Sequence, residues 1–347
     1  MGDSRARRAF IGSFTSAGGR GIVVTEVDAD TGALTETGVS DAVADPSYLA
    51  AGAGGTVLYA VSETSQGAVA AFDAGGPDLR PLGPPVPVAG DGPTHLALAH
   101  GRVLTANYGS GSVSSLALGP DEAPQGTPSV LRHTGQGPDR ERQQEPHAHQ
   151  VLPDPSGRWV LGVDLGTDSV RVCTLDPVTG ELRVHRETAL RPGSGPRHLA
   201  FHPGGRHVCV LGELEAAVTL CRWDEATGEL APVAEIPLVP QDAEGPSYPS
   251  ELAVSPDGRR LWAAVRGQDT IAVVDLDESF EKGELVATVP CGGHWPRDLV
   301  LDPSGRRLYV ANERSGDITW FTLDPTTGHP HPTGSLPVPA PSSILFT

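Results

Sequence analysis

The sequence predicts an all-β fold, a seven-bladed β-propeller whose four-stranded antiparallel blades span residues 1–347 as one domain. Three observations support this prediction. Short apolar runs of alternating pattern recur along the chain between Gly and Pro turns, without the periodicity of amphipathic helices. A strand-opening motif recurs seven times, at a spacing that suits four short strands. The two ends of the chain also carry complementary parts of one blade.

The strand-opening motif starts with a residue, usually proline, that leads into an alternating run such as PRHLA or PRDLV. Neighbouring copies lie 45 to 55 residues apart, which predicts one blade per copy. Four copies continue into a hairpin turn, such as DPSG at Asp154 and HPGG at His202, and then into an apolar strand. The copies open at Pro46, Pro93, Ala148, Pro196, Pro249, Pro296 and Pro341.

The chain ends predict how the ring closes. The amino-terminal part starts with a second-strand pattern, RRAFIGSF, and continues through GIVVTEVD and ALTETG. The carboxy-terminal part stops after a single first-strand pattern, PSSILFT. We expect this last strand to join the amino-terminal blade and so remove the exposed sheet edge of an open array.

The longest predicted loop runs from Gly119 to Pro146 and is polar and rich in turn residues. It includes one short candidate strand at Ser129–His133. Because it directly precedes the sequence HAH, it is a candidate flap over the same face. An ordinary solvated loop is the alternative interpretation.

Composition limits the compartment and the partners. The chain has 43 acidic and 25 basic residues, a net charge of −18, which argues against nucleic acid and anionic membranes as partners. It has no long apolar stretch, and the opening MGDSRARRAF is too short and polar for a leader. We therefore expect a cytoplasmic protein. The cysteines lack a CxxC pair and are predicted to be reduced and buried: Cys173, Cys209, Cys221 and Cys291.

Because the copies align, equivalent positions can be compared around the predicted ring. At two positions the residue type varies from blade to blade and includes charged residues, whereas a purely structural ring would repeat one small or apolar type. The residue after each motif opening forms what we call the anchor ring: Ser47, Thr94, His149, Arg197, Ser250, Arg297 and Ser342. The residue that ends the following strand forms the strand-end ring: Phe14, Glu63, Tyr108, Leu165, Glu213, Arg266 and Glu313.

Four of these residues are predicted to converge on one side of the channel mouth, since one antiparallel strand starts beside the end of the next. They form the candidate catalytic set: His149, Arg197, Glu213 and Arg266. Such charges are costly to bury unless they are paired. Two structural alternatives stay open. Arg197 and Glu213 could form an ion pair that staples one blade, and His149 could be a satisfied core histidine.

These residue types suit the chemistry of an anionic carbonyl compound. Guanidinium groups bind carboxylate or phosphate in a fixed fork, and they stabilise a developing oxyanion. A carboxylate and an imidazole beside them can exchange protons near neutral pH. We expect substrate contacts from His147, Arg297, Asn107 and Tyr108. The sequence contains no serine nucleophile elbow, P-loop or dinucleotide fingerprint.

The sequence His147-Ala148-His149 is a candidate for metal binding, because alternate residues of a strand point the same way. A catalytic zinc site usually needs a third protein ligand, and no partner pattern is visible. Oxygen atoms from Asn107, Asp164 and Asn312 could serve calcium, but turn and strand-end roles are commoner for such residues. We therefore expect no metal and no cofactor.

Several segments between residues 93 and 323 resemble the seven-bladed lactonase family, which includes propeller-type 6-phosphogluconolactonases and carboxymuconate cycloisomerases of similar fold. They are ANYGSGSVS, PHAHQVLPDPSGRWVLGVDLGTDSVRV, GPRHLAFHPGGRHV, ELAVSPDGRRLW, VRGQDTIAV and PRDLVLDPSGRRLYVAN. The resemblance implies a metal-independent site in which a histidine, two arginines and a glutamate act on a lactone. Those positions fall on His149, Arg197, Glu213 and Arg266.

The sequence departs from the family pattern at two places. VRG replaces the usual NRG triplet, with Val265 in place of a polar residue, and Glu213-Leu214 continues as Glu215-Ala216-Ala217. These departures leave the substrate open. The leading function is hydrolysis of an anionic sugar lactone, such as 6-phosphogluconolactone. The alternatives are a lactonising cycloisomerase and a non-catalytic propeller that binds a small ligand or a protein.

Overall fold

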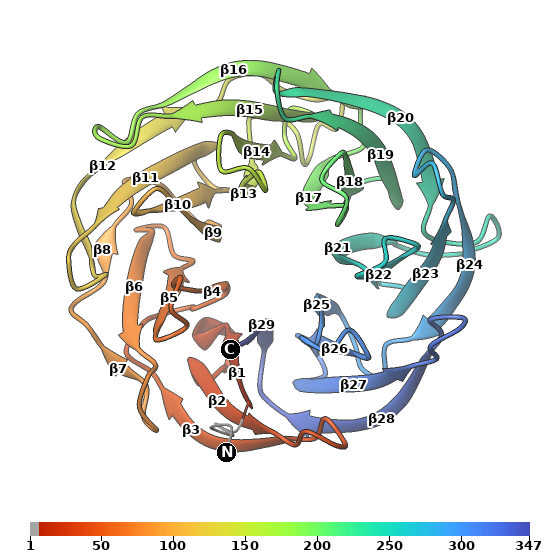
Figure 1. The fold of residues 1–347 in the computed structure, drawn as a ribbon, viewed down its shortest axis with the longest axis horizontal. Helices are drawn as coiled ribbons and strands as arrows, with labels where there is room; N and C mark the ends of the chain where they lie inside the picture. The colour runs from red at the N-terminus through yellow and green to blue at the C-terminus, as the bar shows by residue number, and fades with distance from the viewer. Residues whose placement is uncertain (1–6) are drawn as a thin grey trace.

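The computed structural model describes residues 7–347, which form seven β-sheets arranged as blades around a central channel (Figure 1). Each blade places its first strand nearest the channel and its last strand at the rim. This arrangement confirms the predicted seven-bladed all-β propeller. Residues 1–6, which belong to the stretch from which we expect no leader, lie outside the described residues.

The amino-terminal blade contains β29 (Pro341–Phe346), β1 (Arg7–Ser13), β2 (Ile22–Val27) and β3 (Leu34–Ser40). The second contains β4 (Leu49–Ala51), β5 (Val57–Ser62), β6 (Ala68–Asp73), β7 (Arg80–Pro81) and β8 (Val86–Pro87). The third contains β9 (Pro93–Ala99), β10 (Arg102–Asn107), β11 (Ser112–Leu118) and β12 (Pro124–Arg132). The fourth contains β13 (Ala148–Pro153), β14 (Val160–Asp164), β15 (Ser169–Leu175) and β16 (Leu182–Ala189).

The fifth blade contains β17 (Pro196–Phe201), β18 (His207–Gly212), β19 (Ala217–Asp224) and β20 (Glu229–Pro237). The sixth contains β21 (Tyr248–Val254), β22 (Arg260–Arg266), β23 (Thr270–Leu276) and β24 (Gly283–Pro290). The seventh contains β25 (Pro296–Leu301), β26 (Arg307–Asn312), β27 (Asp317–Leu323) and β28 (Pro330–Pro337). A short 3-10 helix, η1 (Thr15–Ala17), follows β1.

The ring closes as predicted, through antiparallel pairing of the last strand, β29, with the first, β1. Ile344 lies opposite Ile11 in this pairing, and Leu345 lies opposite Phe10. The order within the sheet is β29-β1-β2-β3, so the two chain ends build one blade together.

Within residues 7–347, six blades are four-stranded and the second departs from the prediction. Its outer edge consists of two short strands, β7 and β8, which both pair with β6. The sequence of this region, RPLGPPVP at residues 80–87, is rich in proline, which has no backbone N–H to donate. A continuous fourth strand therefore cannot form there.

A β-bulge at the start of the inner strands exposes the anchor ring to the channel. In β13 the ladder shifts register between Ala148 and Gln150, so His149 has no partner in β14. The same shift passes over Arg197 in β17 and Arg297 in β25. Bulges re-aim the extra residue, and here they turn anchor-ring side chains toward one another.

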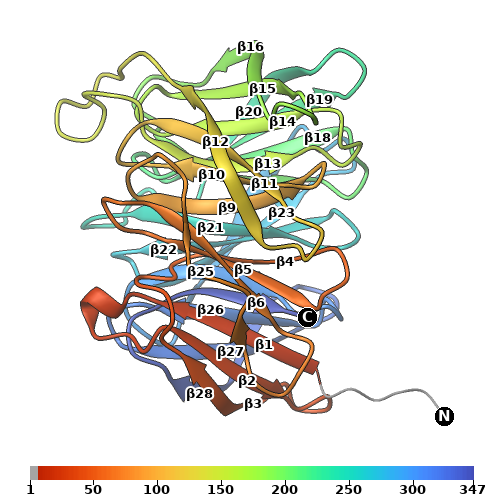
Figure 2. The same cartoon turned by 90° about the vertical axis from the view of Figure 1, so that its left-hand side faces the viewer.

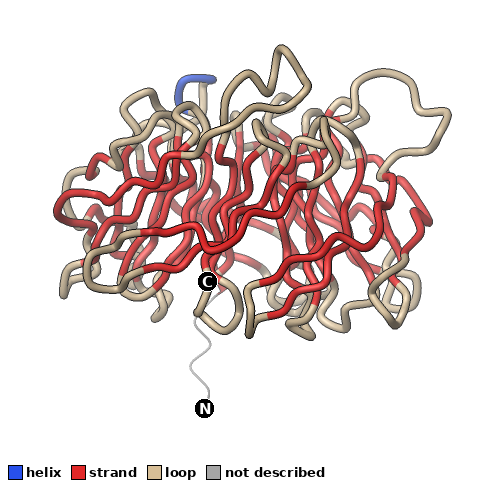
Figure 3. Tube along the Cα trace, turned by 90° about the horizontal axis from the view of Figure 1, so that it is seen from above, coloured by secondary structure: helices blue, strands red, loops and turns tan. Residues whose placement is uncertain are grey.

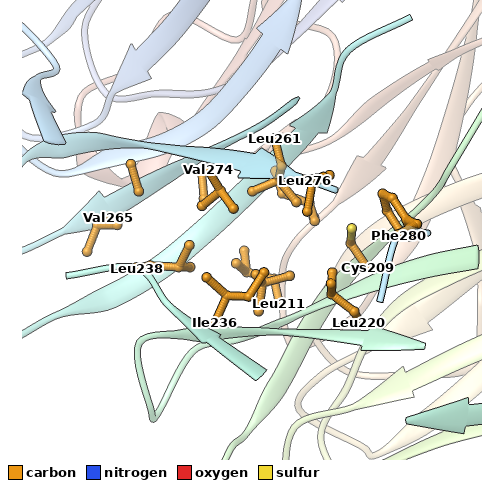
Figure 4. Close-up of a cluster of buried hydrophobic side chains, with 14 residues drawn as sticks. Cys209, Leu211, Leu220, Ile236, Leu238, Leu261, Val265, Val274, Leu276 and Phe280 are labelled. Carbon is orange, nitrogen blue, oxygen red and sulfur yellow. The ribbon is translucent and has the colours of Figure 1, made fainter. Parts of the chain in front are cut away.

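Apolar side chains fill the spaces between neighbouring blades. Figure 4 shows the cluster between the fifth and sixth blades, where Leu211 and Ile236 pack with Leu261 and Val274. All four cysteines are free and buried, as predicted. The blades are thus held rigidly around the channel, which fixes the positions of the residues at its mouth.

The two faces of the ring differ. Figures 2 and 3 show η1 on one face and the chain's carboxy terminus at the opposite one. The inner strands start on the η1 face, so the anchor ring lies there. In residues 7–347, no helix is long and apolar enough to cross a membrane.

Candidate active site

The carboxylate of Glu213 is the centre of a buried charge cluster on the η1 face. Its Oε2 lies 3.1 Å from Arg197 Nε and 3.0 Å from Arg266 Nη2. The exposed fractions are 5% for Glu213, 3% for Arg197 and 6% for Arg266. The contact with Arg197 is an ion pair without an aligned hydrogen bond. The structure thus brings together three members of the predicted catalytic set.

A third guanidinium, that of Arg142, completes the cluster, and the sequence analysis did not identify it. Arg142 Nη2 donates to Glu213 Oε1 at 2.7 Å and to the Tyr108 hydroxyl at 3.4 Å. Arg142 belongs to the segment between β12 and β13, inside the predicted flap. Much of the predicted loop is strand β12 itself, and only the part after it reaches the site. The sequence feature that could have indicated Arg142 is the run PDRERQQEP, which contains two arginines and directly precedes HAH.

Gln143 holds this segment in place. It is fully buried, and its Nε2 donates to Leu165 O at 2.8 Å and to Asp168 Oδ1 at 2.7 Å. Asp168 also accepts the backbone N–H groups of Gly193 and Gly195. The residues beside Arg142 are therefore tied to the loop that leads into β17.

Electrostatics fix the ionisation of the cluster. Burial opposes ionisation of Glu213, but Arg266, Arg197 and Arg142 outweigh it and lower the Glu213 pKa to about 2. Burial, reinforced by Arg266, lowers the pKa of Arg197 to about 10. At neutral pH one carboxylate therefore faces three guanidinium groups, and the cluster keeps excess positive charge. Glu213 is a weak base in this setting and orients the arginines.

His149 lies beside the cluster as a neutral imidazole. Burial lowers its pKa well below 6.5, and the nearby charge of Arg197 adds to the effect. Its ring meets the Tyr108 ring edge-on at 5.6 Å, and its buried Nδ1 has no hydrogen-bond partner. A neutral imidazole can accept a proton, whereas the resulting imidazolium is unfavourable near the arginines.

Tyr108 and His147 form a stacked pair next to His149. Their ring centroids are 4.3 Å apart, with an interplanar angle of 15°. A hydrogen bond of 3.0 Å joins His147 Nδ1 to Tyr108 O. The Tyr108 hydroxyl also accepts from Arg142, so this pair links the flap segment to β13.

Arg297 occupies the other side of the channel mouth. Its Nη1 donates to Glu313 Oε2 at 3.2 Å, and its Nη2 lies 3.8 Å from Glu63 Oε1. The guanidinium carbon lies 4.6 Å from the centroid of the Phe14 ring. Burial raises the pKa of Glu63, although Arg297 opposes the shift. The strand-end ring thus supplies the partners of Arg297.

The structure does not bring Asn107 to the cluster. Its side chain is fully buried and bonds within its own blade, to Thr105, Ser112 and Ser114. The polar atoms of Asn107 therefore stabilise its own blade and do not face the cluster. In residues 7–347, no group of three or more His, Cys, Asp or Glu residues is arranged to hold a metal ion.

Trp295 is a second residue that the sequence analysis missed. It precedes the sixth motif, which opens at Pro296, and has a φ of 65°, a conformation rare for bulky residues. The same position is glycine in two other blades, Gly92 and Gly195, each with a φ of 57°. The Trp295 ring centroid lies 5.6 Å from the guanidinium carbon of Arg266, and the backbone N–H of Trp295 donates to Asp269 Oδ1 at 2.8 Å.

A cavity of about 10 Å³ lies in the channel below the cluster, lined by residues that include Glu63, His149, Arg197 and Arg297. This volume holds about one water molecule. Larger hollows exist elsewhere, such as one of about 530 Å³ beside His202 and Phe280. That hollow contains none of the buried arginines. The small cavity below the cluster therefore suits a water molecule and is too small for a lactone.

The fold and the cluster define a propeller with a buried arginine–glutamate–histidine site at one mouth of its channel. The family model described as "Lactonase, 7-bladed beta-propeller" matches residues 8–346. The chain belongs to this lactonase family, as the sequence resemblance predicted.

Similar proteins cover nearly the whole chain. The 6-phosphogluconolactonase of Bacillus subtilis is 34% identical over 325 residues, 92% of each chain. The solved periplasmic gluconolactonase of Pseudomonas aeruginosa is 27% identical, with a TM-score of 0.90 over 98% of each chain. A solved protein from Lactobacillus plantarum is also 27% identical, with a TM-score of 0.92 over 99% of each chain.

Proposed function

We propose that this protein hydrolyses the ester bond of an anionic sugar lactone, such as 6-phosphogluconolactone, without a metal ion. The observation that carries the proposal is the set of three guanidinium groups around Glu213, which leaves excess positive charge at the channel mouth. Similar proteins named 6-phosphogluconolactonase and gluconolactonase support the same reaction class.

Arg197 and Arg266 bind the lactone carbonyl in this proposal and stabilise the oxyanion that forms on it. Both are buried, which strengthens their interaction with a developing negative charge. Glu213 holds the two guanidinium groups in a fixed orientation, so that little reorganisation accompanies the reaction. Arg142 and Arg297 lie on either side and bind the anionic substituent of the sugar.

His149 is the proton acceptor. Its neutral imidazole lines the small channel cavity, and a water molecule there can attack the carbonyl carbon from below. The carbonyl polarisation that a metal would supply comes from the arginines instead. The proposal therefore needs no Lewis acid.

A lactone panel tests this proposal. Acid release is followed in a pH-stat with 6-phosphogluconolactone, gluconolactone and carboxymuconolactone, each corrected for spontaneous hydrolysis. We expect saturable release, fastest with the phosphorylated lactone and unchanged after dialysis against EDTA. Incorporation of ¹⁸O from labelled water into the product acid distinguishes hydrolysis from cycloisomerisation. Absence of turnover, with only ligand-induced melting shifts, would identify a binding protein.

A further inference from the structure

A second ring of polar residues lies directly below the anchor ring. It comprises the residue two positions after each motif opening, and we call it the floor ring: Tyr48, His95, Gln150, His198, Glu251, Asp298 and Ser343. Among its titratable members, three are buried on the consecutive fifth, sixth and seventh blades: His198 on β17, Glu251 on β21 and Asp298 on β25. Hydrolysis as proposed above gives these groups no task.

Contacts connect the floor ring to the candidate active site. A hydrogen bond of 2.6 Å joins His198 Nδ1 to Glu251 Oε2, and the other ring nitrogen of His198 is buried without a partner. The His198 ring centroid lies 5.1 Å from that of His149. Both imidazoles line the small cavity that holds about one water. A chain of groups thus runs from His149 to Glu251.

The two carboxyl groups separate this cavity from the opposite end of the channel. A second cavity, of about 460 Å³, is lined by the carboxy-terminal parts of the inner strands, including Leu152, Phe201 and Leu345. Glu251 and Asp298 belong to the walls of both cavities. The larger cavity therefore lies toward the face of the propeller that carries the carboxy terminus, which is marked C in Figure 3.

Lactone hydrolysis at neutral pH converts one lactone and one water into a hydroxy-carboxylate and one proton. That proton is unstable beside the arginines: Glu213 has a pKa of about 2, and the pKa of His149 lies well below 6.5. Burial raises the pKa of both Glu251 and Asp298 to about 7. Of these groups, the two floor carboxyls are the ones matched to hold a proton near neutral pH.

We propose that His198, Glu251 and Asp298 form a proton exit that leads from His149 through the channel to the opposite face of the propeller. This inference rests on the proposed lactone hydrolysis. The substrate covers the mouth above the cluster, so the floor ring offers a route while product is still bound.

The oxygen of water bonds to the carbonyl carbon while His149 takes one of its protons. The bond from that carbon to the ring oxygen then breaks, and the ring oxygen takes the proton back from His149. The second proton of the water leaves the new carboxyl group, whose carboxylate the arginines favour. It passes through His149 and His198 to Glu251 or Asp298, and then to solvent.

Charged and titratable groups from the surrounding blades face the carboxyl pair. They are Arg197 and His198 from β17, His149 from β13, His95 from β9, Arg297 from β25, Tyr48 beside β4 and Glu63 beside β5. Strand β29 contributes the Ile344 N–H, which donates to Asp298 Oδ2 at 2.6 Å. This bond and the one between His198 and Glu251 each join two neighbouring blades, so a purely structural role is the alternative.

Near-isosteric variants separate the two roles. Glu251→Gln and Asp298→Asn are expected to lower kcat by about tenfold in weak buffer, with KM unchanged. A high concentration of imidazole buffer, which carries protons by diffusion, is expected to restore kcat. Ser343→Ala, in the same ring but not titratable, is the matched control and is expected to keep the kcat of the unmodified protein. Unchanged kcat in both variants, or a loss that buffer does not rescue, would overturn the proposal.

A measurement without substrate distinguishes failure of the proton exit from failure of the proposed hydrolysis. Infrared difference spectra between about pH 6 and 8 are expected to show a protonated-carboxyl band that disappears on the alkaline side. Glu251→Gln is expected to change or remove this band, and Ser343→Ala to leave it unchanged. If the band is absent, the proton exit is wrong even where lactonase activity is found. If the band is present without any lactonase activity, it is the proposed hydrolysis that fails, and the exit fails with it.

Discussion

Arg142 and Glu213 are 71 residues apart in the chain, yet their side chains form a hydrogen bond of 2.7 Å at the channel mouth. This contact joins the segment after β12 to the end of β18. It makes the flap a part of the site, since Glu213 also orients Arg197 and Arg266. The Arg142 side chain is 37% exposed, so it can meet a ligand that approaches from solvent.

Replacing Arg142 by alanine is expected to raise KM for the phosphorylated lactone about tenfold or more, with a small change in melting temperature. A partly exposed ion pair contributes little to stability, whereas an anionic substrate loses one of its guanidinium contacts. Arg140→Ala is the control, because Arg140 is exposed on the same segment. Steady-state kinetics and thermal unfolding check the result. Equal KM for both variants would show that Arg142 does not contact substrate.

Arg197 provides the test of oxyanion stabilisation. Arg197→Ala is expected to lower kcat about a hundredfold or more, as removal of one such donor does elsewhere. Arg197→Lys is expected to restore only part of the rate, because an ammonium lacks the planar fork. Glu213→Gln leaves the buried guanidinium groups of Arg197 and Arg266, and the partly exposed one of Arg142, without their counter-ion, so both kcat and melting temperature are expected to fall. Near-normal kcat in all three variants would leave the cluster as a structural ion pair.

The repeat determines which part of the site could be predicted from sequence. His149, Arg197, Glu213 and Arg266 stand at equivalent positions of aligned motifs, so comparing blades finds them without coordinates. Arg142 does not belong to a repeated position, because the path of a long loop is set by tertiary contacts such as those of Gln143. The paired outer strands of the second blade were missed for a related reason. Their prolines change hydrogen bonding in one copy alone.

The floor ring shows a second limit of prediction from the sequence. Successive side chains of a regular strand point to opposite sides. Only one of two neighbouring positions in each inner strand is therefore expected to face the channel. The bulges before Gln150, His198 and Glu251 change that rule, and they let two successive residues face the channel. A register shift of this kind is visible in coordinates and has no clear signal in one sequence.

Proton acceptance by His149 predicts the pH dependence of the reaction. The reactive form is the neutral imidazole, whose pKa burial and Arg197 hold well below 6.5. As pH falls, kcat/KM is therefore expected to stay constant through 6.5 and to decline only in more acidic solution. A profile of initial rates, corrected for spontaneous hydrolysis, tests this. An acid limb centred at 6.5 would instead indicate an exposed, unperturbed histidine as the base.

Ring closure by β29 makes a stability prediction. Deleting residues 341–347 exposes the edge of β1 and removes the Ile344 N–H that Asp298 accepts. The truncated protein is expected to aggregate and to melt at a lower temperature, because an unpaired strand edge promotes association. Removal of Thr347 alone, which is exposed at the end of the chain, is the control. Size-exclusion chromatography and thermal unfolding compare the two. A truncated protein that remains monomeric with an unchanged melting temperature would contradict this account.

Trp295 gives the last prediction, because it keeps a costly backbone conformation at a position where two other blades have glycine. Its ring packs against Arg314, whose guanidinium carbon lies 3.4 Å from the ring centroid. A positive φ costs little for the equivalent Gly92 and Gly195. In a residue with a bulky side chain, such as Trp295 with its φ of 65°, it strains the backbone by on the order of 1–3 kcal/mol. The ring also packs beside Arg266, which has to keep its orientation toward Glu213. Strain of this kind persists where surrounding contacts hold it, as the Asp269 carboxylate does here.

Trp295→Gly is therefore expected to lower kcat/KM about tenfold while changing the melting temperature little, since relief of backbone strain offsets the lost packing. Ala340→Gly is the matched control: Ala340 occupies the same position of the first blade, with a φ of 47°, and it is not in contact with Arg266 in any described interaction. Its replacement relieves similar strain and is expected to leave kcat/KM unchanged. Equal activity of both variants would show that Trp295 does not position Arg266, whereas a loss confined to Trp295→Gly would identify it as a positioning residue for the arginine.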